Sequence, residues 1–342
     1  SDDVETLKKI YSKHSNKIYK TGSPRSDLWK LDFSDYWEIP STVPKKPFLL
    51  ISCNTGYANN VKTFGEIIKF ENEMGRFESY PEQLILRIGR AAEDFKKILA
   101  YIDAVKYLSN HNNGYDIVLR PHPAEDLDAW KILLKDIPNV HVLRDGPINA
   151  WVNSSFAVMH NSCTTALEAT ISKKPVVTYL PFDQQFSPQL ANELGFKVNS
   201  LESLLKKVND IFTYSKSDDQ NEEKKELPNV ISKKVLFDNN ELASEKIIKI
   251  WEKLDDDKLS KPSSLKKFRL ILKYNKFKNI FKRLLKEFFL KKIIENNKNS
   301  KFSKLNKQDL DKKLEKLKNI LRISHKIECK LLSDKTILIK RS

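Results

Sequence analysis

The chain has little glycine, and three glycine-dependent signatures are missing from it. Only 8 of its 342 residues are glycine. Neither the GxGxxG pattern of dinucleotide-binding loops nor the GxxxxGK[ST] pattern of P-loops occurs. The GxSxG nucleophile elbow of α/β-hydrolases is missing as well. The sequence therefore gives no support to these three kinds of site.

Cysteine and long apolar runs are also scarce. Cys53, Cys163 and Cys329 are far apart and odd in number, so neither a disulfide framework nor a zinc site is indicated. We expect them to be small buried side chains. No apolar run reaches the roughly 18 residues that a membrane span requires, and no secretion signal is recognisable. We therefore expect a cytoplasmic protein, soluble or peripheral to a membrane.

The charge is divided unevenly along the chain. Residues 261–342 carry 26 Lys and Arg against 7 Asp and Glu, whereas residues 1–260 carry 35 against 38. A near-neutral body argues against a nucleic-acid channel running through it. The basic excess therefore belongs to the tail and needs its own explanation.

Strand-like apolar runs alternate with helix-like segments between residues 48 and 212. This alternation predicts an α/β fold with a doubly wound parallel sheet. The expected strands are 48–52, 116–119, 140–143, 156–159, 175–179 and 196–198. The expected helices are 84–108, 125–135, 147–152, 163–172, 187–194, 200–212 and 241–251. In the longest helix, spacing predicts a buried apolar stripe of Ile85, Ile88, Ala92, Phe95, Ile98, Leu99 and Ile102.

Two polar motifs come at the ends of predicted strands. Arg120-Pro121-His122-Pro123 follows one strand, and the segment His160 to Glu168 follows another. Parallel strands end at a common edge of the sheet, where ligands bind. The second motif also places hydroxyls and backbone N–H groups at a helix start, which attracts phosphate. We therefore predict a nucleotide site made by Arg120, His122, Pro123, His160, Asn161, Ser162, Thr164, Thr165 and Glu168.

Each motif also has a purely structural interpretation. The prolines simply end a strand and prepare the next helix, and Thr165-x-x-Glu168 matches a capping box. Binding is favoured because two prolines fix the direction of His122, and because the second motif has more polar groups than a cap uses. Glu168, one turn into the helix, is placed to accept hydrogen bonds from ribose hydroxyls.

Weaker candidates lie in two other loops. Asn54, Thr55 and Tyr57 follow the first predicted strand and either form a turn or face the same cleft. Asp183 either contacts the ligand or caps a helix. Asp126-Leu127-Asp128 has the letters of a metal-binding DxD motif, but carboxylates in a first helical turn favour the helix dipole. We therefore expect neither a metal nor a cofactor.

The order of these motifs resembles that of bacterial surface-carbohydrate biosynthesis proteins. The resemblance covers about residues 17 to 212. These proteins look like GT-B glycosyltransferases and are similar to the Kdo transferases of capsule and O-antigen synthesis. More distantly, they resemble CDP-glycerol glycerophosphotransferases of teichoic-acid synthesis. The matching segments are Gly22-x-Pro24-Arg25-x-Asp27, Asn54-Thr55-Gly56-Tyr57, Arg120-Pro121-His122-Pro123, Asn161-Ser162-x-Thr164-Thr165-x-x-Glu168 and Lys174-Pro175-Val176-Val177.

This resemblance implies a role for individual residues. In related CMP-sugar transferases a His-Pro motif and a Ser/Thr motif hold the CMP moiety. Carried over to this chain, these are His122-Pro123 and Ser162, Thr164 and Thr165. The implied reaction is transfer of a Kdo-like or other acidic sugar from a CMP-activated donor to a glycan or lipid-linked acceptor, in capsule or lipopolysaccharide synthesis.

The resemblance also implies two Rossmann-like domains with the active site between them. Residues 1–43 are then the end of an amino-terminal domain, with a helix 4–13 and a strand 17–19, followed by a linker. Residues 44–255 form the nucleotide-sugar-binding domain, and 256–342 a basic amphipathic helical tail. The acceptor domain with the usual catalytic carboxylate would precede Ser1. No catalytic base is therefore assigned, although Asp27 and Asp183 are the carboxylates to consider.

The tail has the pattern of a membrane-surface helix. Within residues 264–294, six bulky apolar residues share one helical face that basic residues flank, which suits an anionic inner membrane surface. A helix that packs on another domain is the alternative. We also expect a helix 310–321 and a terminal hairpin. The six apolar residues are Phe277, Ile280, Phe281, Leu284, Leu285 and Phe288.

Three other functions stay open at this point. A CDP-polyol phosphotransferase and a UDP-sugar epimerase of the same fold would use a similar phosphate site. A basic membrane- or nucleic-acid-binding protein would use the tail. We expect no nucleic acid partner, because bulky apolar residues interleave the basic ones and suit lipid better than a phosphate backbone.

Overall fold

The computed structural model describes residues 2–111, 114–217, 228–235, 237, 240–258, 306–324, 326–333 and 336–341. The chain forms two compact units, Ser1–Ser244 and Glu245–Ser342. The predicted membrane-surface helix 264–294 lies outside the described residues.

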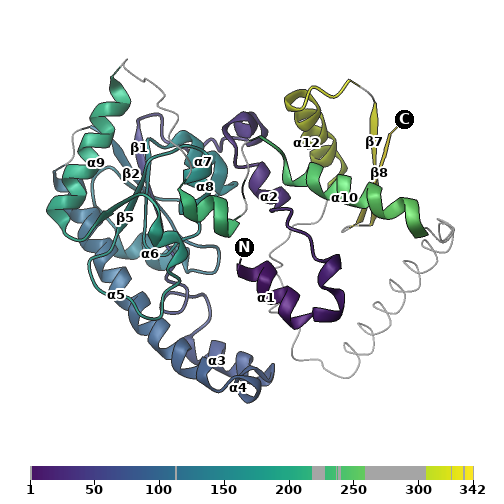
Figure 1. The fold of residues 1–342 in the computed structure, drawn as a ribbon. Coiled ribbons are helices and arrows are strands. Elements are labelled where there is room, and N and C mark those ends of the chain that lie inside the picture. The colour runs from purple at the N-terminus through teal and green to yellow at the C-terminus, as the bar shows by residue number, and fades with distance from the viewer. Residues whose placement is uncertain are drawn as a thin grey trace, which may run out of the picture. The chain divides into compact units, whose positions relative to one another are not determined.

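The first unit is built on a six-stranded parallel sheet (Figure 1). Its order is β3-β2-β1-β4-β5-β6, which confirms the expected doubly wound α/β fold. Each of the six strands predicted between residues 48 and 198 agrees with an observed one to within a residue at either end. The strands are β1 (Phe48–Ser52), β2 (Asp116–Arg120), β3 (Val140–Val142), β4 (Ala157–His160), β5 (Val176–Tyr179) and β6 (Phe196–Val198).

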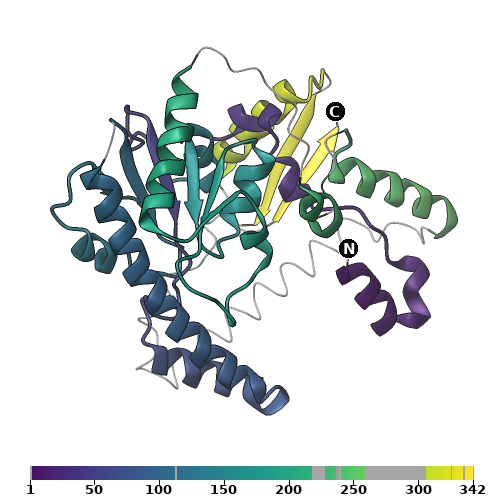
Figure 2. The same cartoon turned by 60° about the vertical axis from the view of Figure 1, so that its left-hand side comes forward.

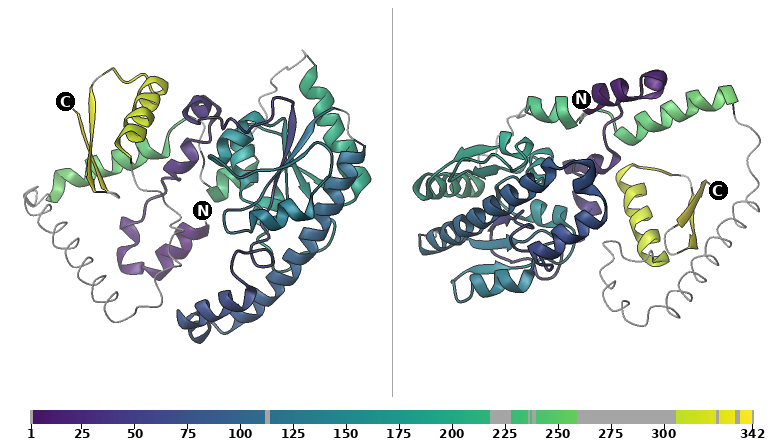
Figure 3. Two further views of the ribbon diagram at one scale, coloured as in Figure 1. Left: turned by 180° about the vertical axis from the view of Figure 1, so that it is seen from behind. Right: turned by 90° about the horizontal axis from the view of Figure 1, so that it is seen from below.

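Helices cover both faces of this sheet, as the view from behind in Figure 3 also shows. Successive residues of β1 point to opposite faces: Leu49 and Ile51 pack with one helix layer, and Phe48 and Leu50 with the other. Burial on both sides explains why the strands are nearly continuous apolar runs. The first layer contains α5 (Glu82–Asn110), α6 (Leu127–Leu133) and α9 (Leu201–Lys216), and the second α7 (Ile148–Ser154) and α8 (Thr165–Ile171).

Two helices that the sequence analysis did not anticipate precede α5. They are α3 (Phe64–Glu73), which begins with a capping box of Thr63 and Glu66, and α4 (Arg76–Ser79). Together with the amino-terminal half of α5 they extend beyond the sheet (Figure 2). The Thr63-x-x-Glu66 pattern was the signal in the sequence that marks the start of α3.

The predicted buried stripe of α5 was wrong for most of its residues. Ile85, Ile88, Phe95 and Leu99 are 49% to 65% exposed, whereas Ile98 is buried. The side that faces the protein carries four buried charged residues instead, Arg90, Glu93, Asp94 and Lys97. The part of α5 that carries these four residues packs against polar loops rather than against the apolar strands. Its charged side chains are therefore buried and its apolar side chains exposed.

Two shorter predictions also need correction. The expected strand 17–19 is absent: a 3-10 turn η1 (Ser12–Lys17) follows α1 (Asp2–Ile10), and the next residues are irregular. An isolated three-residue strand without a pairing neighbour has no ladder to stabilise it. The expected helix 187–194 is reduced to a single 3-10 turn, η3 (Leu190–Glu193), because residues 185–187 are bound to α5 instead.

Residues 24–36 of the amino-terminal segment pack on the sheet domain. This segment contains α2 (Pro24–Asp27) and η2 (Leu31–Tyr36), and the hydroxyl of Ser172 donates to the carbonyl of Trp29 over 2.7 Å. Buried Asp27 accepts hydrogen bonds from the backbone N–H groups of Ala243 (3.0 Å) and Ser244 (3.1 Å). Asp27 therefore caps α10 (Ala243–Lys258), and this structural role removes it as a candidate base.

Two further features complete the description. A short π-helical turn, η4 (Ile231–Val235), brings Ile231 into the core beside α8. In the second unit, α12 (Lys307–Ile320) is followed by an antiparallel pair of β7 (Ile327–Ser333) and β8 (Thr336–Arg341). The expected helix 310–321 and terminal hairpin are thus confirmed. Within the described residues, no helix is both long and apolar enough to cross a membrane.

Candidate functional site

The candidate site lies where the strand order of the sheet reverses. From β1 the chain builds β2 and β3 on one side, and it then crosses to build β4, β5 and β6 on the other. In open α/β sheets, ligands bind outside the carboxyl ends of the strands at such a switch point. The loops after β1, β2, β4 and β5 therefore define the region of interest.

The loops after β1 and β4 are joined directly across the switch point. The side-chain amide of Asn54 donates to the carbonyl of Ser162 over 3.0 Å. One residue before the β1 loop, the hydroxyl of Ser52 donates to that of Thr165 over 2.9 Å. The two halves of the sheet thus present one connected surface at this edge.

Buried Glu125 joins the loops after β1 and β2. Its carboxylate accepts from the backbone N–H of Thr55 (2.8 Å) and from the indole of Trp130 (2.7 Å). Burial raises the pKa of Glu125 even though these hydrogen bonds lower it. Asp126, the next residue, caps α6 by accepting from the N–H groups of Asp128 and Ala129. The DxD letters therefore begin a helix here.

Asn161 and Ser162 bind the loop after β5. The Asn161 amide donates to the carbonyl of Tyr179 (2.8 Å) and accepts from Gln184 (2.7 Å). Ser162 has a left-handed backbone, with φ at 56°, and its N–H donates to Asn192 over 2.7 Å. Both side chains are at most 2% exposed, so they position the loop where ligand contact was expected.

His160 has an interior position rather than the expected ligand-facing one. Its ring is fully buried. One ring nitrogen is paired with the hydroxyl of Thr178 at 2.9 Å, and the other accepts from the N–H of Cys163 at 3.4 Å. Burial lowers the pKa of His160 to about 3. The ring is therefore neutral and braces β4 against β5.

Arg120 is also used inside the protein. Its guanidinium donates to the carbonyls of Asp145 (2.9 Å) and Gly146 (2.6 Å) and lies over the ring of Trp151, 5.4 Å from its centroid. Burial lowers its pKa to about 10. The expected phosphate contact is thus replaced by contacts with the loop that follows β3.

Three of the predicted residues are exposed at the surface of these loops: His122, Pro123 and Thr164. Thr164 occupies the cap position of α8 without a side-chain cap hydrogen bond, so the capping box considered above does not form. Its neighbour Thr165 is buried and accepts from Ser52. The ring of His122 accepts from the N–H of Ala124 over 3.2 Å, which fixes the imidazole on its own loop.

Glu168 is buried one turn into α8. Its carboxylate accepts from the amide of Asn149 over 3.2 Å and lies 3.6 Å from the guanidinium of Arg25. Burial raises the pKa of Glu168 to about 7, although Arg25, Arg120 and Asn149 lower it. Arg25 is largely exposed, so this pair links a buried carboxyl to the surface.

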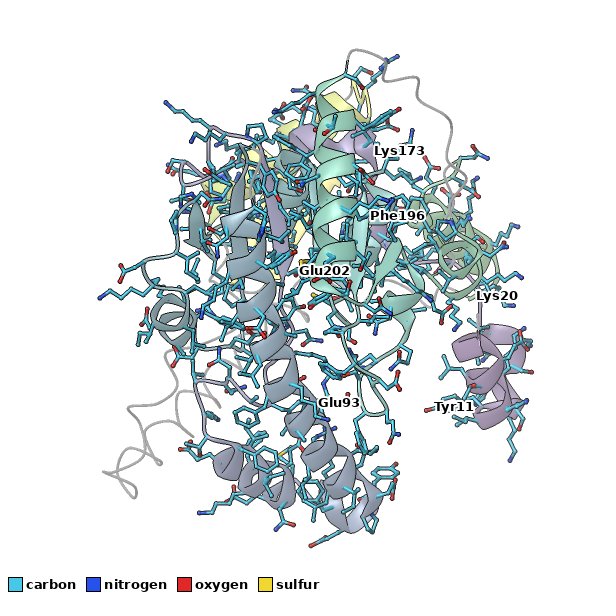
Figure 4. The ribbon with its side chains drawn as sticks, turned by 90° about the vertical axis from the view of Figure 1, so that its left-hand side faces the viewer. Tyr11, Lys20, Glu93, Lys173, Phe196 and Glu202 are labelled. Atoms are coloured by element: carbon cyan, nitrogen blue, oxygen red, sulfur yellow. The ribbon has the colours of Figure 1, made fainter. Side chains whose placement is uncertain are left out.

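A charged cluster on α5 was missed by the sequence analysis. Figure 4 shows Glu93 on the side of α5 that faces the loop after β5. Its carboxylate accepts from the N–H groups of Gln185 (2.6 Å) and Phe186 (2.9 Å) and from the hydroxyl of Ser187 (2.5 Å). Gly89, one turn earlier, leaves room for Phe186, since a Cβ there would lie 2.6 Å from its ring.

The same cluster holds the loop after β1. Asp94 accepts from the N–H of Tyr57 over 3.1 Å and pairs with Arg90 (3.1 Å) and Lys97 (3.2 Å). Lys97 also donates to Ser187 over 2.7 Å. Burial raises the pKa of Asp94 and lowers that of Lys97. Only a charged row opposite the apolar stripe of α5 signalled this cluster in the sequence.

The weaker candidates differ in their placement. Thr55 is fully buried, and Asn54 and Tyr57 are partly exposed, with the guanidinium of Arg87 5.3 Å from the Tyr57 ring centroid. Asp183 is exposed in the loop after β5. Across the described ranges, no group of three His, Cys, Asp or Glu side chains is arranged to hold a metal ion.

The chain is similar to several solved structures of known proteins. No protein-family model matches the sequence, and no curated protein does. The UDP-GlcNAc 2-epimerase of Methanocaldococcus jannaschii, solved with UDP-GlcNAc and UDP, is 17% identical with a TM-score of 0.38, over 70% of this chain and 55% of that one. MnaA of S. aureus, solved with UDP, is 15% identical with a TM-score of 0.39, over 73% and 56%.

A glycosyltransferase is also among the similar structures. WaaG, which is involved in lipopolysaccharide biosynthesis, is 13% identical with a TM-score of 0.32, over 55% of this chain and 45% of that one. The chain thus spans a little over half the length of the first two structures and less than half of this one.

Proposed function

We propose that the sheet domain binds the nucleotide part of an activated sugar at the switch point, as the donor-binding half of a glycosyltransferase of bacterial surface-carbohydrate synthesis. The observation that carries this proposal is the hydrogen bond from Asn54 to Ser162, which joins the loops after β1 and β4 where the strand order reverses. The ligands of open α/β sheets bind at such points.

The buried polar contacts support a preformed binding surface. Glu125, Glu93 and Asp94 each hold backbone N–H groups of a loop at this edge. Because these loops are already fixed, a ligand would not have to order them, and the entropic cost of binding is reduced. These three carboxylates thus hold the loops in place.

His122 and Thr164 are the side chains that we propose contact the ligand. Both are exposed on loops that follow β2 and β4. A hydroxyl donates to phosphate oxygens, and so does an imidazole N–H. Because Nδ1 of His122 accepts from the N–H of Ala124, Nε2 carries the hydrogen that the ring can donate to the ligand. When the nucleotide leaves, negative charge grows on its phosphate, and donors that bind this charge more strongly in the transition state accelerate the transfer.

The proposal also includes the identity of the donor and of the acceptor. The donor is a CMP-linked acidic sugar, as the resemblance of His122-Pro123 and Thr164-Thr165 to the CMP-sugar transferases implies. The acceptor is a glycan or a lipid-linked glycan, and residues 264–294 hold the enzyme at the inner face of the cytoplasmic membrane. Since Ser162 is buried, Thr164 is the member of the Ser/Thr motif that contacts phosphate.

A thermal-shift screen of the 342-residue chain with CMP, CDP, UDP and GDP tests the binding. We expect CMP and CDP to raise the melting temperature, since a ligand at 100 times its Kd stabilises the folded state by about 2.7 kcal/mol. The shift should be lost in His122→Ala and Thr164→Ala. Two matched controls, His111→Ala at the end of α5 and Thr213→Ala on α9, alter exposed side chains and should retain it.

Each other outcome bears on a different part of the proposal. Absence of a shift with all four nucleotides overturns nucleotide binding by this chain. A shift that survives in both variants overturns the assignment of His122 and Thr164. Preference for UDP overturns the cytidine donor and favours a UDP-sugar epimerase, for which epimer formation without an acceptor is the assay. Release of CMP from a CDP-polyol but not from a CMP-sugar would favour the phosphotransferase.

A further inference from the structure

The outward face of α5 carries an apolar stripe in an unusual position. Four of its members, Ile85, Ile88, Phe95 and Leu99, are 63%, 49%, 59% and 65% exposed. Ala92 is exposed and Ile102 is half-buried. Large apolar side chains that cluster on an exposed surface mark an interaction site. We call these residues the outer stripe: Ile85, Ile88, Ala92, Phe95, Leu99 and Ile102.

The spacing of the outer stripe is that of a helix–helix seam. Its members are separated by three, four, three, four and three residues, which is the a and d pattern of a coiled coil. Such a seam packs against one other helix along its length. The pattern therefore points to a helical partner rather than to a small ligand or a flat surface.

The first unit cannot bury the outer stripe by rotating α5. The opposite side of the helix holds Asp94 and Lys97, neither of which is exposed, and Glu93, which binds the loop after β5. Rotation would separate these groups from their partners while they are still within the protein, which is costly for charged groups. The stripe must therefore find its partner elsewhere.

We propose that a second copy of this chain covers the outer stripe, with the two α5 helices packed antiparallel about a two-fold axis. In such an interface, contacts are reciprocal between the copies. Antiparallel alignment places Ile85 opposite Ile102 and Ile88 opposite Leu99. All such pairs share one midpoint, between residues 93 and 94, so the stripe is complementary to itself.

The centre of the seam shows the same complementarity in size. The third pair sets Ala92 opposite Phe95, and it occurs twice about the axis. A small residue facing a large one lets the two helices interdigitate without a void. The order of side-chain sizes along the stripe thus fits the antiparallel arrangement.

Charge at the ends of the stripe selects the antiparallel direction. Glu82 and Lys106 are both exposed, one near the start of α5 and the other near its end. Antiparallel packing brings Lys106 of one copy beside Glu82 of the other, and it does so at both ends. Parallel packing would instead bring each of these charges beside its equal, which is repulsive.

This inference does not depend on the proposed function. A single helix seam buries less than the roughly 800 Å² per partner of a standard interface, so we expect dissociation in the micromolar range. The dimer would nevertheless lie directly behind the loops of the candidate site, because the inner face of the same helix holds them.

Sedimentation velocity of the full chain over a range of concentrations tests the proposal. The monomer mass is 39.8 kDa, and we expect twice this mass at high concentration. Phe95→Asp and Leu99→Asp should each give a monomer at all concentrations. The matched control is Ile132→Asp, which changes a 74% exposed residue of α6 and should leave the dimer intact.

A charge exchange tests the direction of packing and does not place a charge in the apolar seam. Glu82→Lys alone and Lys106→Glu alone should each weaken the dimer, and the double variant should recover it. If the single variants have no effect, the antiparallel arrangement is overturned.

Two further results would reject the second copy as the occupant. One is a monomer at every concentration. The other is a dimer that survives in both Phe95→Asp and Leu99→Asp. A monomeric Phe95→Cys variant whose added thiol resists alkylation in the folded protein would assign the stripe to another part of this same chain.

Discussion

Lys97 and Asp94 form an ion pair of 3.2 Å in which neither side chain is exposed to solvent. The pair lies on the inner face of α5, and through Tyr57 and Ser187 it is connected to the loops after β1 and β5. A buried charge is tolerated only while its partners stay in place. This pair therefore links the stability of the domain to the geometry of the candidate site.

We expect Lys97→Met to lower the free energy of unfolding by about 3 kcal/mol, because it leaves the Asp94 carboxylate buried with one partner fewer. Urea denaturation followed by circular dichroism measures the change. Lys96→Met, at the neighbouring exposed position, is the matched control and should change stability by at most about 0.5 kcal/mol. Equal losses in the two variants would show that the buried pair contributes nothing special.

Glu168 should make the protein less stable as the pH rises. Its folded-state pKa is raised to about 7 from an ordinary value of 4.5, so the folded protein binds a proton that the unfolded chain has already released. The contribution is fully present below pH 4.5 and is lost as the pH rises towards 7. Glu168→Gln is neutral throughout this range.

The melting temperature of Glu168→Gln relative to the natural sequence should therefore increase between about pH 5 and about pH 8. Differential scanning calorimetry at several pH values gives this comparison. Glu73→Gln, on an exposed position of α3, serves as the control. A difference that stays constant with pH would contradict burial of an ionisable Glu168.

His160 should have the opposite dependence. Its folded-state pKa is lowered to about 3 from 6.5, so the stability that the neutral ring contributes is present above pH 6.5 and is lost as the pH falls towards 3. We expect His160→Asn to be destabilised near neutral pH, because its contact with Thr178 changes.

The difference in free energy of unfolding between the natural sequence and His160→Asn should become smaller as the pH falls. Only the natural protein loses stability there, because its unfolded chain binds a proton on His160 that the folded protein does not. Urea denaturation near neutral pH and at mildly acidic pH measures this difference. His111→Asn, at an exposed position, should keep the natural pH dependence. A difference that grows in acid would be the contrary result.

Two glycines should respond to alanine in opposite directions. Gly195 has a φ of 72°, and a Cβ there would lie 2.3 Å from the carbonyl oxygen of Val176, so Gly195→Ala should cost about 2 kcal/mol or more. Gly65 lies in α3 with no atom within 4 Å of such a Cβ. Gly65→Ala should stabilise the protein by roughly 0.5 kcal/mol. Thermal unfolding of both variants decides this, and a loss at Gly65 would be unexpected.

The strands were predictable because they are apolar on both faces. The run Phe48 to Ser52 is fully enclosed by the two helix layers, so burial itself is visible in the sequence. The edge at which the two polar motifs lie followed from the parallel arrangement alone. Local patterns of this kind fixed the architecture.

The direction of individual side chains in the loops was not predictable. The left-handed backbone of Ser162 turns its side chain towards Gln184 and Asn192, and no periodicity in the sequence marks such a turn. For the same reason the motif could not tell exposed Thr164 from buried Thr165. Loop residues follow no repeating geometry that would assign each side chain to a face.

The inner cluster of α5 was not predictable because its partners are distant in the chain. Glu93 binds the backbone of residues more than ninety positions later, and Glu125 binds Thr55 seventy positions earlier. Hydrophobic spacing identified the right residues for an apolar stripe on α5 but placed it inward. The spacing shows only that α5 has one apolar and one charged face. The charged face is the buried one because it binds the polar loops after β1 and β5.

The cap that Asp27 provides for α10 has a consequence for synthesis of the chain. Asp27 and Ala243 are separated by 216 positions, so the carboxylate leaves the ribosome long before the N–H groups that it will bind. Contacts of such wide separation form slowly. Until Ala243 and Ser244 have been made, the Asp27 carboxylate has no helix to cap and stays hydrated, so this cap can form only after synthesis has passed residue 244.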